Sequence, residues 1–324
     1  MSTAVRRTMR IRIGWLEVGA TLPGNTAGRV AGSGFYRSVV RPIRMALHRV
    51  WRTNQTAGSP ELPVPNLAVP REAQPELRML IQNVNQVRWY HTIDLGQGVV
   101  TPGFMDHRQH VDRYQLPASL QGLRCLDVAT WDGFWAFEME RRGAAEVVAL
   151  DVASLRDCDI PLRRLPELKD GFDTVALGEG FRLAHEALHS KVKRVVCNVY
   201  DLSPERLGRF DFIFISDLLI HLRNPQLALE RVASVCRGRV VLADIYNPDL
   251  ERYDTCVTEF RGGEGPLLWW SPNTRTLVRM LEVAGLQEIQ EIGRLGLGST
   301  QSTGHLDRVV LTGRAPQTAA QAAG

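Results

Sequence analysis

The chain has 324 residues, of which 44% are hydrophobic, and a formal net charge of +4 at pH 7, enough for one large domain with an appendage. Its apolar runs fall short of the roughly 20 residues of a membrane span, so we expect no membrane contact and a cytoplasmic location. Five cysteines occur without a C-x-x-C pair, which favours free thiols in a reducing compartment and indicates no metal site.

Charge is concentrated at the start of the chain. Residues 1–57 contain ten arginines and one acid, Glu17, a net charge of +9, which leaves −5 for the rest of the chain. Five prolines between residues 60 and 75 are typical of a linker. We therefore expect residues 1–70 to be a basic, proline-rich, flexible segment. It is either an arm that binds RNA phosphates or a dispensable tail.

The next stretch has the composition of a lid. Apolar residues at helical spacing predict an amphipathic helix over residues 76–87. Trp89, Tyr90, His91 and Asp94 follow it, just before a glycine-rich turn at residues 96–98. We expect residues 71–115 to cover a binding site, with Trp89, Tyr90 and Asp94 on the substrate and His91 near the reacting groups. Ordinary packing is the alternative for the two aromatic residues.

Residues 123–151 have the pattern of a βαβ unit. An apolar strand ends at Asp127, a tight turn closes at Gly133, and a helix stops at Gly143 before a second strand that ends in Asp151. Open α/β sheets bind ligands at the edge where such a turn and strand end meet. An acid at the end of the second strand can accept hydrogen bonds from both hydroxyls of a ribose. The unit therefore predicts a site for an adenosine-containing cofactor.

The turn itself argues against a dinucleotide. A pyrophosphate needs the close-approach glycines of G-x-G-x-x-G, whereas this turn has Ala129 and Trp131 at those places and keeps Gly133. A bulky indole leaves poor room for a pyrophosphate, and it is easier to reconcile with the compact methionine end of S-adenosylmethionine. A P-loop motif does not occur.

Several ordered motifs lie between residues 77 and 313: WYHTIDLGQGVVTPG (89–103), RCLDVATWDGFWAFEMERRGA (124–144), VVCNVYDL (195–202), FDFIFISDLLIHLRNPQLALERV (210–232) and LLWWSPNTRTLVRMLEVAGL (267–286). Through them the sequence resembles class I S-adenosylmethionine-dependent methyltransferases, and within these it is similar to the tRNA wobble-uridine (carboxy)methyltransferase-like group. The resemblance implies an α/β Rossmann-like methyltransferase fold over residues 116–315, with a mostly parallel seven-stranded sheet, a C-terminal antiparallel hairpin and an N-terminal helical lid. Residues 316–324 are then a flexible tail.

The remaining elements agree with that fold. We expect helices over residues 179–189, 225–236 and 274–284, the second ended by Gly238, and strands over 195–199, 210–215 and 239–245. Alternation of this kind predicts a parallel sheet with helices on both faces. Two final strands, 288–292 and 308–312, have no helix between them, which is typical of a closing hairpin and not of a dinucleotide fold.

Cofactor contacts follow from these positions. Asp127 is expected to fix the turn and reach the cofactor's ammonium group, while amides near Gly133 favour a carboxylate at a helix N-terminus. Asp151 takes the ribose hydroxyls, and the resemblance implies that Asn198 contacts the adenine, unless it only caps its own loop. The expected cofactor-binding residues are Asp127, Ala129, Trp131, Gly133, Asp151, Asn198, Tyr200 and Ser216.

Catalytic candidates lie after the strand over 210–215. Methyl transfer is an in-line displacement whose rate comes mostly from holding the reactants together, but a hydroxyl acceptor also benefits from a base, and histidine suits that near neutral pH. We expect His221, His91 and Asp217 to be the catalytic residues. A packed helical histidine is the alternative for His221, and an acidic acceptor would need no base.

Substrate contacts are expected from the insertion after residue 245, where Tyr246, Trp269 and Trp270 offer aromatic faces. The leading function is S-adenosylmethionine-dependent O-methylation of a small molecule, such as a sugar or secondary metabolite. Methylation of a tRNA wobble uridine and a non-catalytic partner with a degenerate methyltransferase fold are the alternatives. The sequence does not indicate an oligomeric state.

Overall fold

The computed structural model describes residues 7–13, 16–22, 62, 65–167, 177–264, 267–300 and 305–316. The chain divides into two units, Met1–Gly58 and Ser59–Gly324. In the first, β1 (Arg7–Ile13) and β2 (Leu16–Leu22) form an antiparallel hairpin, which the sequence interpretation did not include. Most of the predicted flexible segment (1–70) and nearly all of the predicted tail lie outside the described residues, so those two predictions stay open.

A seven-stranded sheet is the centre of the second unit, in the order β10-β11-β7-β6-β3-β4-β5. Its strands are β3 (Arg124–Val128), β4 (Glu146–Asp151), β5 (Lys193–Val196), β6 (Phe210–Ser216), β7 (Cys236–Ile245), β10 (Gln287–Leu297) and β11 (Leu306–Arg314). Strands β3 to β7 are parallel, whereas β11 pairs antiparallel with β7 and β10. The predicted fold class is confirmed.

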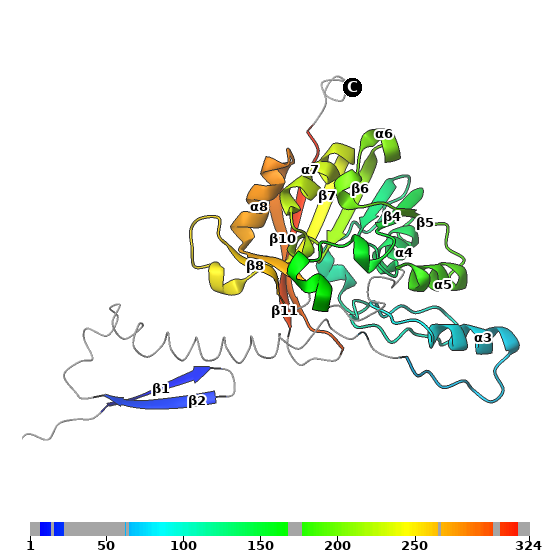
Figure 1. The fold of residues 1–324 in the computed structure, drawn as a ribbon, viewed down its shortest axis with the longest axis horizontal. Coiled ribbons are helices and arrows are strands. Elements are labelled where there is room, and N and C mark those ends of the chain that lie inside the picture. Colours follow the sequence, from blue (N-terminus) through cyan, green and yellow to red (C-terminus); the bar gives the residue numbers. More distant parts are fainter. Residues whose placement is uncertain are drawn as a thin grey trace, which may run out of the picture. The chain divides into compact units, whose positions relative to one another are not determined.

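Helices cover both faces of this sheet (Figure 1). They are α3 (Pro75–Val84), α4 (Phe134–Arg141), α5 (Glu179–Ala187), α6 (Pro204–Leu207), α7 (Pro225–Val235) and α8 (Thr274–Val283). Side chains alternate between the faces along each strand. In β6, Phe212 and Phe214 join the core with α3, α4 and α5, while Ile213 and Ile215 join the core with α7 and α8.

Short 3-10 turns follow β4, β5, β6 and β7, and one precedes β3. They are η2 (Val111–Tyr114), η3 (Leu155–Asp157), η4 (Leu162–Glu167), η5 (Val199–Asp201), η6 (Leu219–His221) and η7 (Pro248–Leu250). Within the described ranges, no helix is long and apolar enough to cross a membrane.

The ends of β5 and α7 are two of the boundaries that differ from the sequence prediction. Strand β5 ends at Val196, because the chain turns into η5 at Asn198. Helix α7 ends at Val235 and β7 begins at once, so Gly238 lies inside a strand and does not end the helix. A Cβ at Gly238 would lie 2.1 Å from the Asp211 carbonyl oxygen. The glycine is therefore required by the close approach of β7 to β6.

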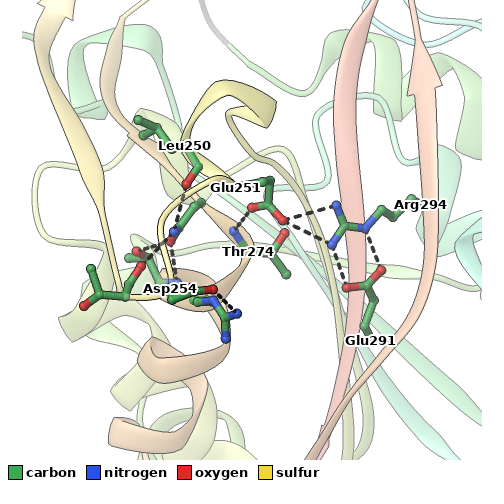
Figure 2. A network of polar contacts seen from close by, with 10 residues as sticks. Leu250, Glu251, Asp254, Thr274, Glu291 and Arg294 are labelled. Atoms are coloured by element: carbon green, nitrogen blue, oxygen red, sulfur yellow. Dashed lines mark hydrogen bonds and ion pairs between the residues drawn. The ribbon is translucent and has the colours of Figure 1, made fainter. Parts of the chain in front are cut away.

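The insertion after β7 forms a second small sheet, a hairpin of β8 (Thr258–Glu264) and β9 (Leu268–Pro272). Figure 2 shows how its first part is anchored: Glu251 accepts a hydrogen bond from the Thr274 amide at 2.7 Å and contacts Arg294 at 3.3 Å. Arg294 in turn donates to Glu291 at 2.6 Å. Asn273 accepts from the Thr276 amide at 3.0 Å and so caps the N-terminus of α8. The insertion is thus tied to α8 and β10.

Candidate functional site

The turn between β3 and α4 lies at the carboxyl edge of the sheet. Ala129, Trp131 and Gly133 all have positive φ, at 64°, 48° and 91°, a region that costs an ordinary residue about 1–2 kcal/mol. The amides of Ala129 and Thr130 donate to the Leu150 carbonyl at 2.9 and 3.0 Å. The turn thus keeps a tight, glycine-like backbone although two of the three residues carry side chains.

Three carboxyl groups are buried around this turn: Asp127, Asp132 and Asp151 are 2%, 3% and 7% exposed. Burial raises the pKa of Asp127 and of Asp132 to about 7, and it also raises the pKa of Asp151. Within the described ranges none of them forms an ion pair with a lysine or arginine, although Arg194 lies near enough to offset part of the rise at Asp151. The turn therefore concentrates acidic groups that lack a cationic partner.

Each of these carboxyl groups holds a backbone or side-chain donor. Thr130 Oγ1 donates to Asp127 at 2.6 Å, and the amides of Trp131 and Val152 donate to Asp151 at 2.7 and 2.8 Å. Asp151 therefore joins the turn to the end of β4. Every carboxylate oxygen has two acceptor positions, so these bonds leave room for ligand hydroxyls on the same group.

The sequence interpretation missed Asp132. Its Oδ2 accepts from the amides of Tyr90 and His91 at 2.6 and 2.9 Å, which joins the lid to the turn. A Cβ at Gly180 would lie 2.4 Å from the other carboxylate oxygen, so α5 also approaches it closely. The available signal was an acid directly before Gly133, in a turn already expected to bind a ligand.

The lid residues divide into packed and accessible ones. Trp89 is fully buried, and its indole N–H donates to the Val84 carbonyl at 3.1 Å, so packing replaces the predicted substrate contact. Asp94 is exposed and accepts from the Gly96 amide at 2.9 Å, which makes it a turn residue. Tyr90 is partly exposed, and its ring centroid lies 5.2 Å from that of Trp131 at the cofactor turn.

His91 is buried among aromatic side chains and stacks on Phe134 with ring centroids 5.8 Å apart. Burial lowers its pKa to about 3, so the imidazole is neutral at physiological pH and a weak base. Its Nδ1 has no hydrogen-bond partner and lies 4.0 Å from Asp132 Oδ2. The buried His107, whose Nδ1 lies 3.0 Å from the Tyr114 hydroxyl, is a neighbour that sequence reasoning did not identify.

Asp217 does not have the form of a catalytic base. Arg308 donates to both of its carboxylate oxygens, at 2.7 and 2.8 Å, and is itself only 1% exposed. The same guanidinium donates to the Leu297 and Leu306 carbonyls at 3.1 Å. A buried, doubly bonded pair of this kind holds the carboxylate as a counter-ion. We therefore correct the prediction: Asp217 is a structural partner of Arg308.

The buried acid Asp244 holds the segment that follows β6. Asp244 accepts from the Leu218 and Leu219 amides at 3.2 and 2.7 Å, and burial raises its pKa to about 7. Ser216 lies just before this segment, and its buried Oγ has no hydrogen-bond partner. The pKa of Tyr90 is also raised, first by burial and then by the charge of Asp217. The Tyr90 phenol therefore lies at the same end of β6.

His221 belongs to η6 and approaches the insertion. Its Nδ1 lies 3.3 Å from the Leu267 carbonyl oxygen, just before β9. The structure therefore places His91 beneath the lid and His221 against the hairpin. The catalytic role predicted for His221 stays a prediction.

Asn198 and Tyr200 hold loops together. Asn198 accepts from the Tyr200 amide at 3.1 Å and donates to the Asp157 carbonyl at 3.3 Å, so it adopts the alternative capping role. The Tyr200 phenol donates to Asp159 and accepts from the Asn224 amide at 3.0 Å. Both side chains thus hold loops at this edge of the sheet, and the adenine contact predicted for Asn198 and Tyr200 stays a prediction.

The predicted substrate aromatics are also anchored. The indole N–H groups of Trp269 and Trp270 donate to the Asp159 and Leu222 carbonyls at 2.7 and 3.0 Å. Trp269 is buried, whereas Trp270 is partly exposed beside Phe260, which is 63% exposed at a centroid distance of 5.1 Å. Tyr246 lies against the Arg294 guanidinium, 4.8 Å from its ring centroid. Trp270 and Phe260 thus form the aromatic surface of the hairpin.

Comparisons with known proteins agree with this geometry. A magnesium-protoporphyrin O-methyltransferase from Rhodobacter capsulatus is 31% identical over 113 residues, which cover 35% of this chain and 40% of that protein. The chain thus matches less than half the length of this curated relative. No protein-family model matches the chain.

The N-terminal domain of EvdMO1, crystallised in the presence of SAH and D-fucose, is 18% identical with a TM-score of 0.51 and covers 76% of this chain and 100% of that one. Magnesium protoporphyrin IX methyltransferase from Synechocystis PCC 6803 with bound SAH is 15% identical with a TM-score of 0.40, covering 61% and 76% of the two chains.

The part of the chain that the structure describes contains no group of three histidine, cysteine, aspartate or glutamate residues placed to hold a metal ion. Strand order, the closing antiparallel hairpin and the likeness to the EvdMO1 domain agree with one another. The chain therefore has the Rossmann-like fold of class I S-adenosylmethionine-dependent methyltransferases.

Proposed function

We propose that this chain is an S-adenosylmethionine-dependent methyltransferase that acts on an oxygen atom of a small molecule, such as a sugar or secondary metabolite. One observation carries the proposal: three buried acids, Asp127, Asp132 and Asp151, surround the turn at the carboxyl edge without a lysine or arginine ion pair in the described ranges. Buried carboxylates without a counter-charge are costly. A ligand that carries positive charge would reduce that cost.

The charge of the cofactor complements this site. S-adenosylmethionine carries a sulfonium and an ammonium group, which complement the acids, and Asp127 is the residue that would hold the ammonium. Asp151 would hold the ribose, and the unpartnered Oγ of Ser216 is a further group available to the ligand. The turn before α4 keeps a tight backbone with Ala129 and Trp131 in place of the glycines of dinucleotide folds, which favours the compact methionine end of S-adenosylmethionine over a pyrophosphate.

When bound, the cofactor supplies an electrophilic methyl group. The chain's own residues then serve chiefly to position the acceptor, because Arg308 holds Asp217 and burial lowers the pKa of His91 to about 3, which leaves His221 as the candidate base. Tyr90 keeps its proton at neutral pH, since its pKa is raised, and it can donate a hydrogen bond to the acceptor. Positioning of this kind accounts for much of the rate of a displacement reaction.

The choice of acceptor has its own support. The Rhodobacter capsulatus relative is named as an O-methyltransferase of a small molecule, which favours an oxygen acceptor here. The tRNA alternative is supported by the ten arginines of residues 1–57. Within that segment the structure describes only the strands β1 and β2.

Calorimetry with S-adenosylhomocysteine and its 2′,3′-dideoxy analogue tests the site. We expect micromolar binding of the first and about tenfold weaker binding of the second, as for loss of charge-assisted hydrogen bonds. Asp151→Ala should bind both analogues equally weakly, because the carboxylate that discriminates between them is gone. Asp112→Ala changes an exposed acid of η2 and should preserve the discrimination. Absence of binding to the unchanged protein would support the non-catalytic alternative instead.

A further inference from the structure

Asp159 joins three loops and strand β9 at the carboxyl edge of the sheet. Its carboxylate accepts from the Tyr200 phenol and from the Arg223 amide, the latter at 2.6 Å. Its backbone carbonyl accepts from the Trp269 indole N–H at 2.7 Å. The Tyr200 oxygen also accepts from the Asn224 amide at 3.0 Å. One residue thus connects the loop after β4, the turn after β5, the loop between η6 and α7, and strand β9.

Further contacts strengthen the same junction. The Arg223 guanidinium lies 5.0 Å from the Trp269 ring centroid and donates to the Ile160 carbonyl at 3.2 Å. Asn198 donates to the Asp157 carbonyl at 3.3 Å. The loop after β4 begins at Asp151, the expected ribose acid, and it is therefore bonded both to the adenosine side of the site and to the hairpin of the insertion.

The β8–β9 hairpin lies against η6, the turn that follows β6. Leu267, next to β9, approaches His221 in η6, and Phe260 and Trp270 expose their rings. We propose that Asp159 is a positioning residue that couples occupation of the cofactor site to the placement of the β8–β9 hairpin, and so to the acceptor side. This inference depends on the proposed function. If a ligand orders the loop after β4, the hydrogen bond from Trp269 to Asp159 would restrict the motion of the hairpin as well.

Hydrogen exchange of the β8 and β9 amides, with and without S-adenosylhomocysteine, measures this coupling. In the unchanged protein we expect the ligand to slow exchange by about five- to tenfold, the factor that one hydrogen bond is worth. Tyr200→Phe and Trp269→Phe each remove one donor to Asp159 and should abolish this ligand-dependent protection. Trp270→Phe is the matched control, because it removes an indole donor from the same hairpin that bonds to Leu222.

A second pair of variants separates coupling from mere stability. Asp159→Asn keeps an acceptor oxygen for Tyr200 and should retain the protection. Asp159→Ala keeps the backbone carbonyl that accepts from Trp269 but removes the carboxylate that holds Tyr200 and the Arg223 amide. It should therefore weaken the protection while still binding the ligand within about threefold, less than one hydrogen bond is worth. Equal protection in all variants, or none in an unchanged protein that binds the ligand, would overturn the coupling. Failure of the unchanged protein to bind S-adenosylhomocysteine would instead overturn the proposed function.

Discussion

Asp127 is predicted to stabilise the bound cofactor and destabilise the empty protein. Its folded-state pKa of about 7 lies above the ordinary value of 3.8, mainly because of burial. Between these two pH values the folded protein binds more protons than the unfolded chain, so the free energy of unfolding falls as pH rises from about 4 to about 7. The carboxylate contributes least to stability where the enzyme would work.

The size of the effect follows from the same values. A tenfold change in acidity is worth about 1.4 kcal/mol, so raising the pKa from 3.8 to about 7 costs about 4 kcal/mol once the group is ionised. Asn can keep the hydrogen bond from Thr130, now 2.6 Å long, without the charge. Asp127→Asn should therefore raise the free energy of unfolding above pH 7 and change little near pH 4.

Urea unfolding at several pH values, without ligand, measures this difference in the free energy of unfolding. Calorimetry with S-adenosylmethionine measures the opposing loss of affinity, which should be about tenfold or more for a charge-assisted contact. Asp211→Asn is the control, since the pKa of Asp211 is lowered by Arg237. That ion pair contributes stability at neutral pH that disappears in acid, so its variant should lose stability above pH 4 and keep full affinity. A less stable Asp127→Asn protein at pH 8 would refute the reasoning.

Three further outcomes test the neighbouring groups. Arg308→Met should lower the free energy of unfolding in urea by about 3–5 kcal/mol, because it leaves Asp217 buried without its partner. Adding Asp217→Asn should restore much of that stability. An unchanged urea midpoint in Arg308→Met would contradict the role of the buried ion pair. Tyr90→Phe should lower the methyl-transfer rate with unchanged S-adenosylhomocysteine affinity in calorimetry, and equal loss of both would place the hydroxyl on the cofactor. Ala129→Gly should raise the free energy of unfolding by about 0.5 kcal/mol, because its φ of 64° suits glycine, whereas the helical control Ala136→Gly should lower it by about 1 kcal/mol.

The sequence predicted the parts of the site that depend on local pattern. Asp127 and Asp151 lie where an apolar strand ends, and parallel pairing of β3 with β4 brings those ends to one edge. The order of strands and helices likewise follows from hydrophobic patterning and turn residues. These features need no knowledge of which distant side chains meet.

The contacts that the sequence did not reveal join residues that are remote in sequence. Asp217 is matched by Arg308, 91 residues away, and Tyr200 by Asp159, 41 residues away. A strand-end polar residue is equally suited to a ligand, a loop or a counter-ion, and only tertiary contacts decide among them. Asn198 shows this: its position was expected, yet its amide group is used by Tyr200 and Asp157.

The cofactor turn shows how the same backbone can arise without the usual residues. Ala129 and Trp131 adopt positive φ because the bonds to Leu150 and Asp151 hold the chain there. Those bonds come from the end of β4, so the acid expected to bind the ribose also fixes the turn that receives the methionine end. A glycine-based turn would adopt positive φ without help from neighbouring strands, because glycine has no Cβ. Here the two halves of the cofactor site depend on one carboxylate, and loss of Asp151 should disturb both.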